Sequence, residues 1–290
     1  MNRLLVIIAV YNGMQWLGRC LDSVVSSSMD ADLFVCDNAS TDGSADFVEK
    51  DYPGAHLVRS SKNLGFARSN DLGFRYAIEK GYDYVYLLNQ DAWVMPDTFE
   101  KLISAFSSGG WGIISPMQMR PDMTALDKRF KRHYHGPADG SDEVFPVRFV
   151  MAAHWMISSG CLRKTGFFSP AFSHYGEDNN YCDRARYHGF RVGVLPSAVA
   201  VHDRQSRKKT KEQKIIQNCQ YSKVLISNPN SSFAFQSIWQ PVRQCLMSLY
   251  WRSTLPVRTI SQLRKDYPSL RRWREESMEE GAFIDNQISI

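Results

Sequence analysis

The alternation of apolar runs with segments of helical spacing in the first hundred residues constrains the fold more than any other feature. Apolar and β-branched runs of strand length occupy residues 3–11, 31–40, 55–60 and 82–91. Between them, residues 13–27, 41–52 and 65–81 place apolar side chains at helical intervals. Strands that alternate with helices of this length indicate βαβ units. We therefore predict an α/β fold with a mostly parallel central sheet and helices on both faces.

The rhythm changes after residue 106. Residues 110–119 indicate another strand, 120–146 a long loop or small hairpin, and 148–166 a strand with a short helix. An amphipathic helix is expected over 176–189, followed by two strands separated by Pro196. Beyond these we find only helical segments. We predict a catalytic domain over 1–203 and a basic, mainly helical C-terminal extension over 204–290.

The apolar run near the N-terminus predicts a strand and not a signal peptide. It is only about seven residues long, lacks a small-residue cleavage site and ends in the turn signal Asn12-Gly13. No stretch approaches the roughly 18 apolar residues of a membrane span. The six cysteines form no C-x-x-C pair, so we expect thiols in a cytoplasmic protein.

The net charge of +5 is unevenly distributed. Residues 203–290 hold 15 Lys/Arg against 8 Asp/Glu, whereas residues 1–202 hold 20 against 22. The basic character therefore belongs to the C-terminal third. It suits an anionic membrane surface or a nucleic acid, but the basic residues form no recognised nucleic-acid motif, and we exclude that class.

Polar residues collect where the predicted strands end. Asp91 follows the apolar run 84–88, at the sheet edge where open α/β sheets bind ligands. Asp97, with Glu100 three residues later, is a better N-cap for the next helix, which leaves Asp91 without a structural role. The other strand-end residues are Tyr11, Asn12, Asp37, Asn38 and Asn89. Gly65, beside a helix start, suits a phosphate at this edge.

Two downstream signals carry further chemistry. Glu177 and Asp178 begin an amphipathic helix, either as favourable acids in its first turn or as a carboxylate general base. His202 ends an apolar run, either as a structural histidine or as a partner of Asp91 at a divalent metal.

At this point the sequence resembles a known family. The segments "VIIAVYNGMQWLGRCLDSV", "VCDNASTDGS", "NLGFARSNDLGFRYA", "LLNQDAWVMPDTFEKL" and "FSHYGEDNNYCDRARYHGFRVGVLPSAVAVH" are similar to family 2 nucleotide-sugar glycosyltransferases. They follow one another in the family's order from residue 4 to about 203. The resemblance implies the inverting GT-A fold, which is Rossmann-like. It is strongest for bacterial polysaccharide rhamnosyltransferases.

The resemblance also implies roles for individual residues. Asp178 corresponds to the general base, with Glu177 beside it. Asp91 corresponds to the last acid of the D-x-D motif, which binds Mg²⁺ or Mn²⁺, and His202 completes that site in some members. The expected donor-nucleotide residues are Val10, Tyr11, Asn12, Asp37, Asn38, Asn63, Gly65, Asn70, Asn89 and Asp91. Trp155, His174 and Tyr175 are expected on the acceptor side. Asn89 departs from the motif, because it replaces the first acid of D-x-D.

The implied reaction moves a sugar from a UDP- or dTDP-sugar to an acceptor hydroxyl, with a saccharide or lipid-linked saccharide as acceptor, in bacterial cell-surface polysaccharide synthesis. Such chemistry requires stabilisation of the leaving diphosphate and a base for the acceptor proton. A single base gives inversion, since a retaining route needs another carboxylate nucleophile.

Two other functions stay open. A catalytically impaired sugar-nucleotide-binding protein of the same fold is favoured by Asn89. A sugar nucleotidyltransferase is disfavoured, because residues 9–18 contain no lysine or arginine of a phosphate loop. For the extension, the aromatic residues between Phe233 and Trp251 lie among many basic ones. This composition is typical of peripheral membrane contact, but homodimerisation or packing on the catalytic domain is the alternative.

Overall fold

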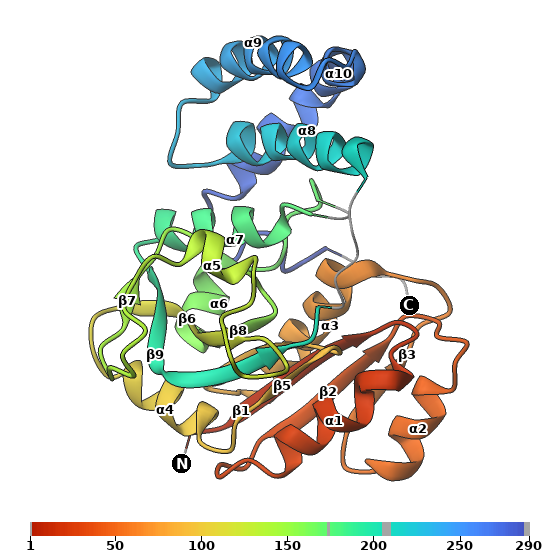
Figure 1. Cartoon of the computed structure of the whole chain (residues 1–290), viewed down its shortest axis with the longest axis vertical. Coiled ribbons are helices and arrows are strands. Elements are labelled where there is room, and N and C mark those ends of the chain that lie inside the picture. Colours follow the sequence, from red (N-terminus) through yellow and green to blue (C-terminus); the bar gives the residue numbers. More distant parts are fainter. Residues whose placement is uncertain (1, 173–174, 205–209, 287–290) are drawn as a thin grey trace.

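The computed structural model of the chain describes residues 2–172, 175–204 and 210–286. Its centre is a nine-stranded sheet in the order β3-β2-β1-β4-β8-β6-β9-β5, with β7 paired to β9 (Figure 1). The strands are β1 Leu4–Val10, β2 Asp32–Asp37, β3 His56–Arg59, β4 Tyr84–Asn89, β5 Ala92–Val94, β6 Trp111–Met119, β7 Phe145–Pro146, β8 His154–Ser158 and β9 Arg191–His202.

Helices cover both faces of this sheet and continue beyond it. Two separate apolar clusters, one on each face, form the core. The helices are α1 Met14–Val25, α2 Ser44–Asp51, α3 Gly65–Lys80, α4 Thr98–Ala105, α5 Phe130–His133, α6 Ser159–Thr165, α7 Glu177–Tyr187, α8 Lys211–Ser227, α9 Phe233–Trp251 and α10 Leu255–Glu276. The predicted α/β fold with C-terminal helices is confirmed.

The two halves of the sheet differ in strand direction. Strands β3, β2, β1 and β4 are parallel, as the βαβ rhythm predicts. Strand β8 is antiparallel to both of its neighbours, and β9 is parallel to β6 but antiparallel to β5. Parallel pairing therefore dominates only the N-terminal half, which is where the carboxyl ends of β1, β2 and β4 share one edge.

Two local predictions are wrong. Residues 191–202 form one strand, not two, because Pro196 lies in an irregularity: Leu195 pairs with Pro116, and the next pair joins Val199 to Met117. A residue without an amide hydrogen is tolerated at such a bulge. Asp97 precedes α4 but forms no capping hydrogen bond, because its carboxylate binds Lys101 at 2.6 Å. The predicted capping box with Glu100 is absent.

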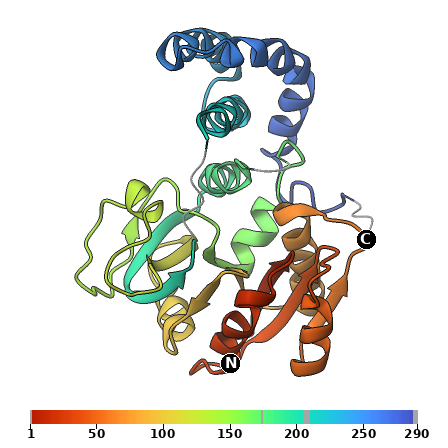
Figure 2. The same ribbon diagram turned by 45° about the vertical axis from the view of Figure 1, so that its right-hand side comes forward.

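The C-terminal helices form a layer of their own. Helices α8, α9 and α10 pack together around Ile226, Leu263 and Leu270. In both ribbon views α9 lies at the end of the molecule away from the sheet, with α8 and α7 between (Figures 1 and 2). No helix in the described ranges is long and apolar enough to cross a membrane.

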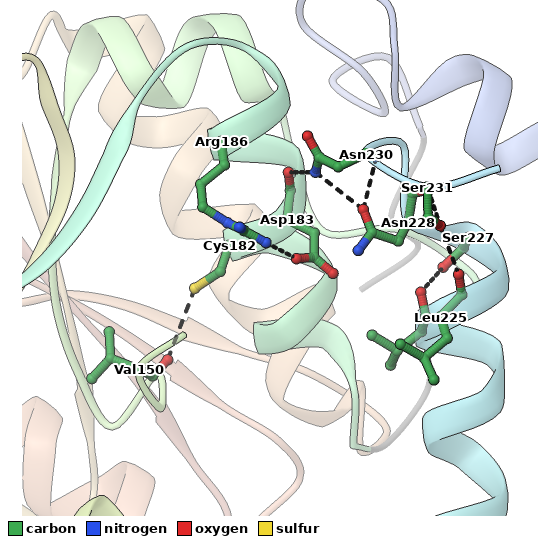
Figure 3. A network of polar contacts seen from close by, with 10 residues as sticks. Val150, Cys182, Asp183, Arg186, Leu225, Ser227, Asn228, Asn230 and Ser231 are labelled. Carbon is green, nitrogen blue, oxygen red and sulfur yellow. Dashed lines mark hydrogen bonds and ion pairs between the residues drawn. The ribbon is translucent and has the colours of Figure 1, made fainter. Parts of the chain in front are cut away.

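Helix α7 anchors this layer to the sheet domain. Asn230, in the loop before α9, donates to the carbonyl oxygen of Asp183 at 2.7 Å (Figure 3). Asn180 of α7 also donates to Ser227. After α10 the chain returns to the main core, where Ala282 and Phe283 are buried and the amide of Phe167 donates to the carbonyl of Ala282. The division at residues 203 and 204 stays a prediction, and the tail adds a second connection across it.

Candidate active site

The carboxyl ends of β1 and β4 are joined by one side chain, Gln90. Its Oε1 accepts from the amide of Tyr11 at 2.8 Å, and its Nε2 donates to the carbonyl of Tyr11 at 3.1 Å. A Cβ at Gly13 would lie 2.5 Å from Gln90 Oε1, so glycine provides the space for this contact. The exposed Tyr11 ring is thereby held at the edge by its backbone, while Val10 is buried.

The loops after β1 and β2 are bound to one another through Asn12. Its Oδ1 accepts from the amide of Thr41 at 2.9 Å, and its own amide donates to Ser40 at 3.0 Å. Asn12 and Ala39 both adopt the left-handed conformation, with φ of 47° and 59°. A non-glycine residue keeps the left-handed conformation only where neighbouring contacts hold it, which is common at binding sites.

Asp37 presents a buried oxygen without a partner. It is 4% exposed, and its Oδ2 accepts from the amide of Ser40 at 3.0 Å. Its Oδ1 has no hydrogen-bond partner among the described residues. A buried carboxylate oxygen left unpaired costs free energy, so the site favours a ligand that brings an N–H or O–H donor.

Three other residues predicted to bind the nucleotide form hydrogen bonds within the protein. Asn38 is buried, and its Oδ1 accepts from Leu64 and Ser69, which fixes the start of α3. Asn70 is buried and donates to the carbonyl of Phe66. Asn63 accepts from the amide of Gly65, which has a φ of +77°. Asn38 and Asn70 therefore hold the start of α3 in place through hydrogen bonds with backbone and hydroxyl groups.

Asp91 and His202 meet at the centre of the edge. His202 Nε2 lies 3.3 Å from Asp91 Oδ1, and the side chain of Asp91 is 27% exposed against 2% for His202. Burial acts to raise the pKa of Asp91, but the hydrogen bond from His202, together with the charge of Arg204, outweighs it, so the pKa is lowered. Asn89, two residues earlier, is half-buried and bonds through its backbone. In the described part of the chain no third His, Cys, Asp or Glu completes a cluster with this pair.

The tautomer of His202 is set by Arg204. The Nε of Arg204 donates to His202 Nδ1 at 3.2 Å, so Nδ1 accepts and Nε2 carries the proton that faces Asp91. Behind this pair lies His154, fully buried between the Tyr86 hydroxyl and the carbonyl of Val201. Burial, reinforced by His202, lowers the pKa of His154 to about 3, so this ring is neutral.

Arg204 is surrounded by carboxylates from three segments. It lies 3.6 Å from Asp127 Oδ2, and its charge lowers the pKa of both Asp91 and Asp178. Direct contacts therefore link Asp91 to His202, His202 to Arg204 and Arg204 to Asp127. We take this group, together with Asp178, as the candidate active site.

The acidic pair Glu177 and Asp178 begins α7, after Gly176 at a φ of 100°. The Oδ1 of Asp178 accepts from the amide of Asn179 at 2.8 Å. Burial raises the pKa of both carboxyls, and the charge of Asp178 adds to the effect on Glu177. The Oε2 of Glu177 is buried without a partner in the described ranges. A carboxyl whose pKa is raised toward neutrality suits proton transfer.

The acceptor-side prediction is wrong for one residue. Trp155 is fully buried on β8, donates to the carbonyl of Val150 at 3.1 Å and packs near Tyr181. It belongs to the core, because its strand is central in the sheet. Tyr175 is 37% exposed with a φ of 65°. His174 lies outside the described residues.

Sequence reasoning missed two site residues, Gln90 and Arg204. Gln90 lies between Asn89 and Asp91, so its place in the motif was visible, but its contact with Tyr11 depends on the pairing of β1 with β4. Arg204 lies two residues after His202 in a basic stretch. In the structure its side chain is half-buried and donates to His202, a contact that the basic composition does not reveal.

The family comparison agrees with this geometry. The model of the family described as Glycosyl transferase family 2 matches residues 5–164, which is more than half of the chain. The match includes β1 to β8 and the Asp91 segment, and it ends before α7.

Individual relatives are distant. The low-salt glycan biosynthesis hexosyltransferase Agl10 of Haloferax volcanii is 24% identical over 183 residues, 60% of this chain and 59% of that protein. The dTDP-rhamnosyl transferase RfbF of Shigella flexneri is 22% identical over 158 residues, 52% of this chain and 53% of that protein. The chain thus spans less than two thirds of the length of these relatives.

Among solved structures, the mannosyltransferase PcManGT from Pyrobaculum calidifontis, in complex with GDP-Man and Mn²⁺, has a TM-score of 0.59 at 16% identity. The similarity covers 95% of this chain and 73% of that one. At this identity the comparison establishes the GT-A fold.

Proposed function

The chain belongs to glycosyl transferase family 2, and we propose that it transfers a hexosyl group from a UDP- or dTDP-sugar to an acceptor hydroxyl with inversion at the anomeric carbon. The observation that carries the proposal is the pairing of Asp91 with His202, whose facing atoms are 3.3 Å apart, with Arg204 bonded to the same histidine. Asp91 is the proposed metal ligand, and Asp178, in the first turn of α7, is the proposed base.

The nucleotide base would bind at Asp37. Uracil and thymine both carry an N3–H donor, which matches the unpaired buried Oδ1 of this carboxylate. The remaining proposed donor contacts are Val10, Tyr11, Asn12, Asn63, Gly65 and Asn89, with Asn38 and Asn70 as positioning residues. The dTDP-sugar named for the Shigella relative supports thymidine as one of the two choices.

Asp91 and His202 fit a divalent metal that is shared with the diphosphate. Two ligands at about 2.1 Å in an octahedral site are about 3 Å apart, close to the 3.3 Å between these atoms. One carboxylate and one imidazole suit Mg²⁺ or Mn²⁺ when phosphate oxygens and water supply the other ligands. When bound, the metal would supply positive charge beside the leaving diphosphate.

Arg204 must move for His202 to act as a ligand. While it donates to Nδ1, Nε2 holds a proton and is not available to a metal. The diphosphate offers this arginine a stronger, charge-assisted partner. We infer that donor binding draws Arg204 from Nδ1 toward the phosphates.

Asp178 would accept the proton of the acceptor hydroxyl. The freed oxygen then forms a bond to the anomeric carbon, while the bond from that carbon to the diphosphate breaks and the nucleoside diphosphate leaves. Glu177 lies alongside as the second acid of the pair, and burial together with the charge of Asp178 raises its pKa to about 7. Tyr175 and His174 stay proposed as acceptor contacts.

We propose bacterial cell-surface polysaccharide synthesis as the setting, at the cytoplasmic side of the membrane, with a saccharide or lipid-linked saccharide as acceptor. The sheet domain 1–203 would carry the chemistry, and the extension 204–290 would contact a membrane or a second copy.

A donor panel tests the function. The full chain is incubated with UDP-, dTDP- and GDP-sugars and Mn²⁺, and release of nucleoside diphosphate is measured. We expect release from a uridine or thymidine donor, and at least about 10²-fold slower release from the Asp178→Asn variant. Nucleotide binding by titration without release from any donor would instead support the impaired sugar-nucleotide binder, which Asn89 favours.

A further inference from the structure

Helix α9 exposes large apolar side chains and buries polar ones, the opposite of an ordinary surface helix. Seven large apolar residues lie exposed along it and form the α9 apolar face, defined as Phe235, Ile238, Trp239, Val242, Leu246, Leu249 and Tyr250. Their exposed fractions run from 43% at Trp239 to 76% at Leu249. A helix that packs on a protein core normally turns such residues inward.

The inward side of α9 is polar. The buried residues of the helix are Gln240 and Gln244. Gln244 donates to Ser222 of α8 at 2.6 Å and accepts from Cys219. The one charged residue between Phe233 and Trp251 is Arg243, which binds Asn218 and Ser222 of α8. Helix α9 is therefore attached through these hydrogen bonds and through Phe233, which packs on the small apolar core, whereas the seven exposed apolar side chains are left for another surface.

The width of the α9 apolar face distinguishes a coiled-coil partner from a membrane surface. At 100° per residue its members cover about 120° of the helix circumference, from Ile238 to Tyr250, with no charged residue among them. A strict coiled-coil seam is narrower than this. Wide apolar faces that contain Trp, Tyr and Phe are typical of helices lying in the plane of a membrane interface.

Charge decides between a lipid surface and a second copy. Residues 210–274 hold eleven Lys/Arg and only two acids, Glu212 and Asp266. Asp266 is paired with Lys223 at 2.7 Å. Cations such as Arg252, Arg258 and Lys265 are exposed. A second copy would bring the same positive charge to the contact, whereas anionic headgroups complement it.

We propose that the α9 apolar face binds the surface of an anionic lipid bilayer, with the helix lying in the interface plane. Helix α9 lies at the end of the molecule away from the sheet (Figure 2), and the side chains of its apolar face are exposed, so the bilayer can approach without displacing any element of the sheet domain. The proposal stands independently of the glycosyl-transfer activity.

One cysteine provides a direct probe. Cys245 is exposed and the other five cysteines are buried, so a polarity-sensitive maleimide dye labels the full chain at α9. Vesicles of phosphatidylcholine with about one third phosphatidylglycerol are added at low salt and at 0.5 M salt. We expect a blue shift of dye emission and co-sedimentation at low salt, both reduced at high salt, because salt screens surface charge.

Matched variants isolate the face. We expect Ile238→Gln with Leu249→Gln to weaken binding at least about tenfold, since both side chains are more than 70% exposed and would lose their apolar contact. Val25→Gln, on an exposed valine of α1, should have no effect. Arg258→Gln with Lys265→Gln should weaken binding to anionic vesicles while leaving the melting temperature unchanged.

Several results would overturn the proposal. One is the absence of binding to the anionic vesicles at low salt, and another is binding to pure phosphatidylcholine vesicles that equals binding to the anionic ones. A third is a loss of binding in the Val25→Gln control as large as that in the Ile238/Leu249 variant. A dimer by light scattering that the Ile238/Leu249 variant converts to a monomer would also do so, because the face would then be a protein interface.

Discussion

The carboxyl edge of the sheet and helix α9 depart from ordinary burial in opposite directions. At the edge, Asp37, His154 and Arg204 hold polar or charged groups inside the protein. At α9, glutamines are buried and large apolar side chains are exposed. Each departure costs folding free energy. Both departures are consistent with the proposed partners, which are a polar ligand at the edge and an apolar surface at α9.

The two regions are nevertheless connected by one helix. Helix α7 carries Asp178 in its first turn, and further along it holds the loop before α9 through Asp183 (Figure 3). We expect the chemistry of one region to be separable from the binding of the other, because their contacts share no side chain. The predictions below test that separation, from the largest expected effect to the smallest.

Replacing Asp178 by Asn should reduce turnover at least about 10²-fold, because the acceptor proton loses its base. The amide keeps the shape of the carboxyl and its hydrogen bond from Asn179, so nucleoside diphosphate affinity and vesicle binding should be unchanged. Steady-state kinetics, nucleotide titration and co-sedimentation measure the three quantities. Retained turnover together with lost nucleotide affinity would show that Asp178 belongs to the donor site.

Replacing Asp91 by Ala should weaken Mn²⁺-dependent nucleotide binding by about 10- to 100-fold, the range for loss of a metal contact. The fold should persist, since the side chain is partly exposed and its partner is His202. Calorimetric titration of UDP and dTDP with and without Mn²⁺ measures the effect. The assignment fails if the variant binds either nucleotide with the metal dependence of the unmodified chain.

The Arg204→Met variant should move the acid side of the pH–turnover profile to higher pH. Turnover requires ionised Asp178, whose pKa burial already raises above the ordinary value of about 3.9. Arg204 opposes that rise, so removing its charge raises the pKa further. Arg59→Met, which loses only an exposed pair with Asp46 and Glu49, is the control. If the pH–turnover profile is unshifted in both variants, Arg204 does not influence the pKa of the catalytic base.

The smallest effect is expected at α9 itself. Ile238→Gln should change the free energy of unfolding by less than about 0.5 kcal/mol, because the side chain contacts little protein. Leu263→Ala, in the small core beneath, should cost about 2–4 kcal/mol. Chemical denaturation measures both. A large loss for Ile238→Gln would mean that the face packs on the protein in solution.

Local patterns predicted much of the fold. The spacing of apolar residues located β1 to β4 and α1 to α3, because a parallel βαβ unit imposes a distinct period on each element. The same patterns did not give the antiparallel β8, nor the single bent β9. Strand direction and register depend on which strands meet, and that is decided by contacts between segments far apart in the chain.

The candidate site also combines features that local sequence predicts with features that depend on tertiary contacts. Asp37, Asp91, Asp178 and His202 could be proposed from the sequence, because a polar residue at a strand end or helix start has few local partners to explain it. The burial of Asn38, Asn70 and Trp155 could not be predicted, since it depends on α3 and β8 packing against the sheet.

The sequence by itself determined the βαβ half of the sheet, the carboxylates at its edge and the basic, aromatic composition of the extension. Only the tertiary structure decided that Arg204 turns inward to His202, that Gln90 joins two strands, and that α9 faces outward with its apolar side. The physical reason is that composition and period define which side of an element is apolar, whereas the direction in which that side points depends on the neighbours that the folded chain provides.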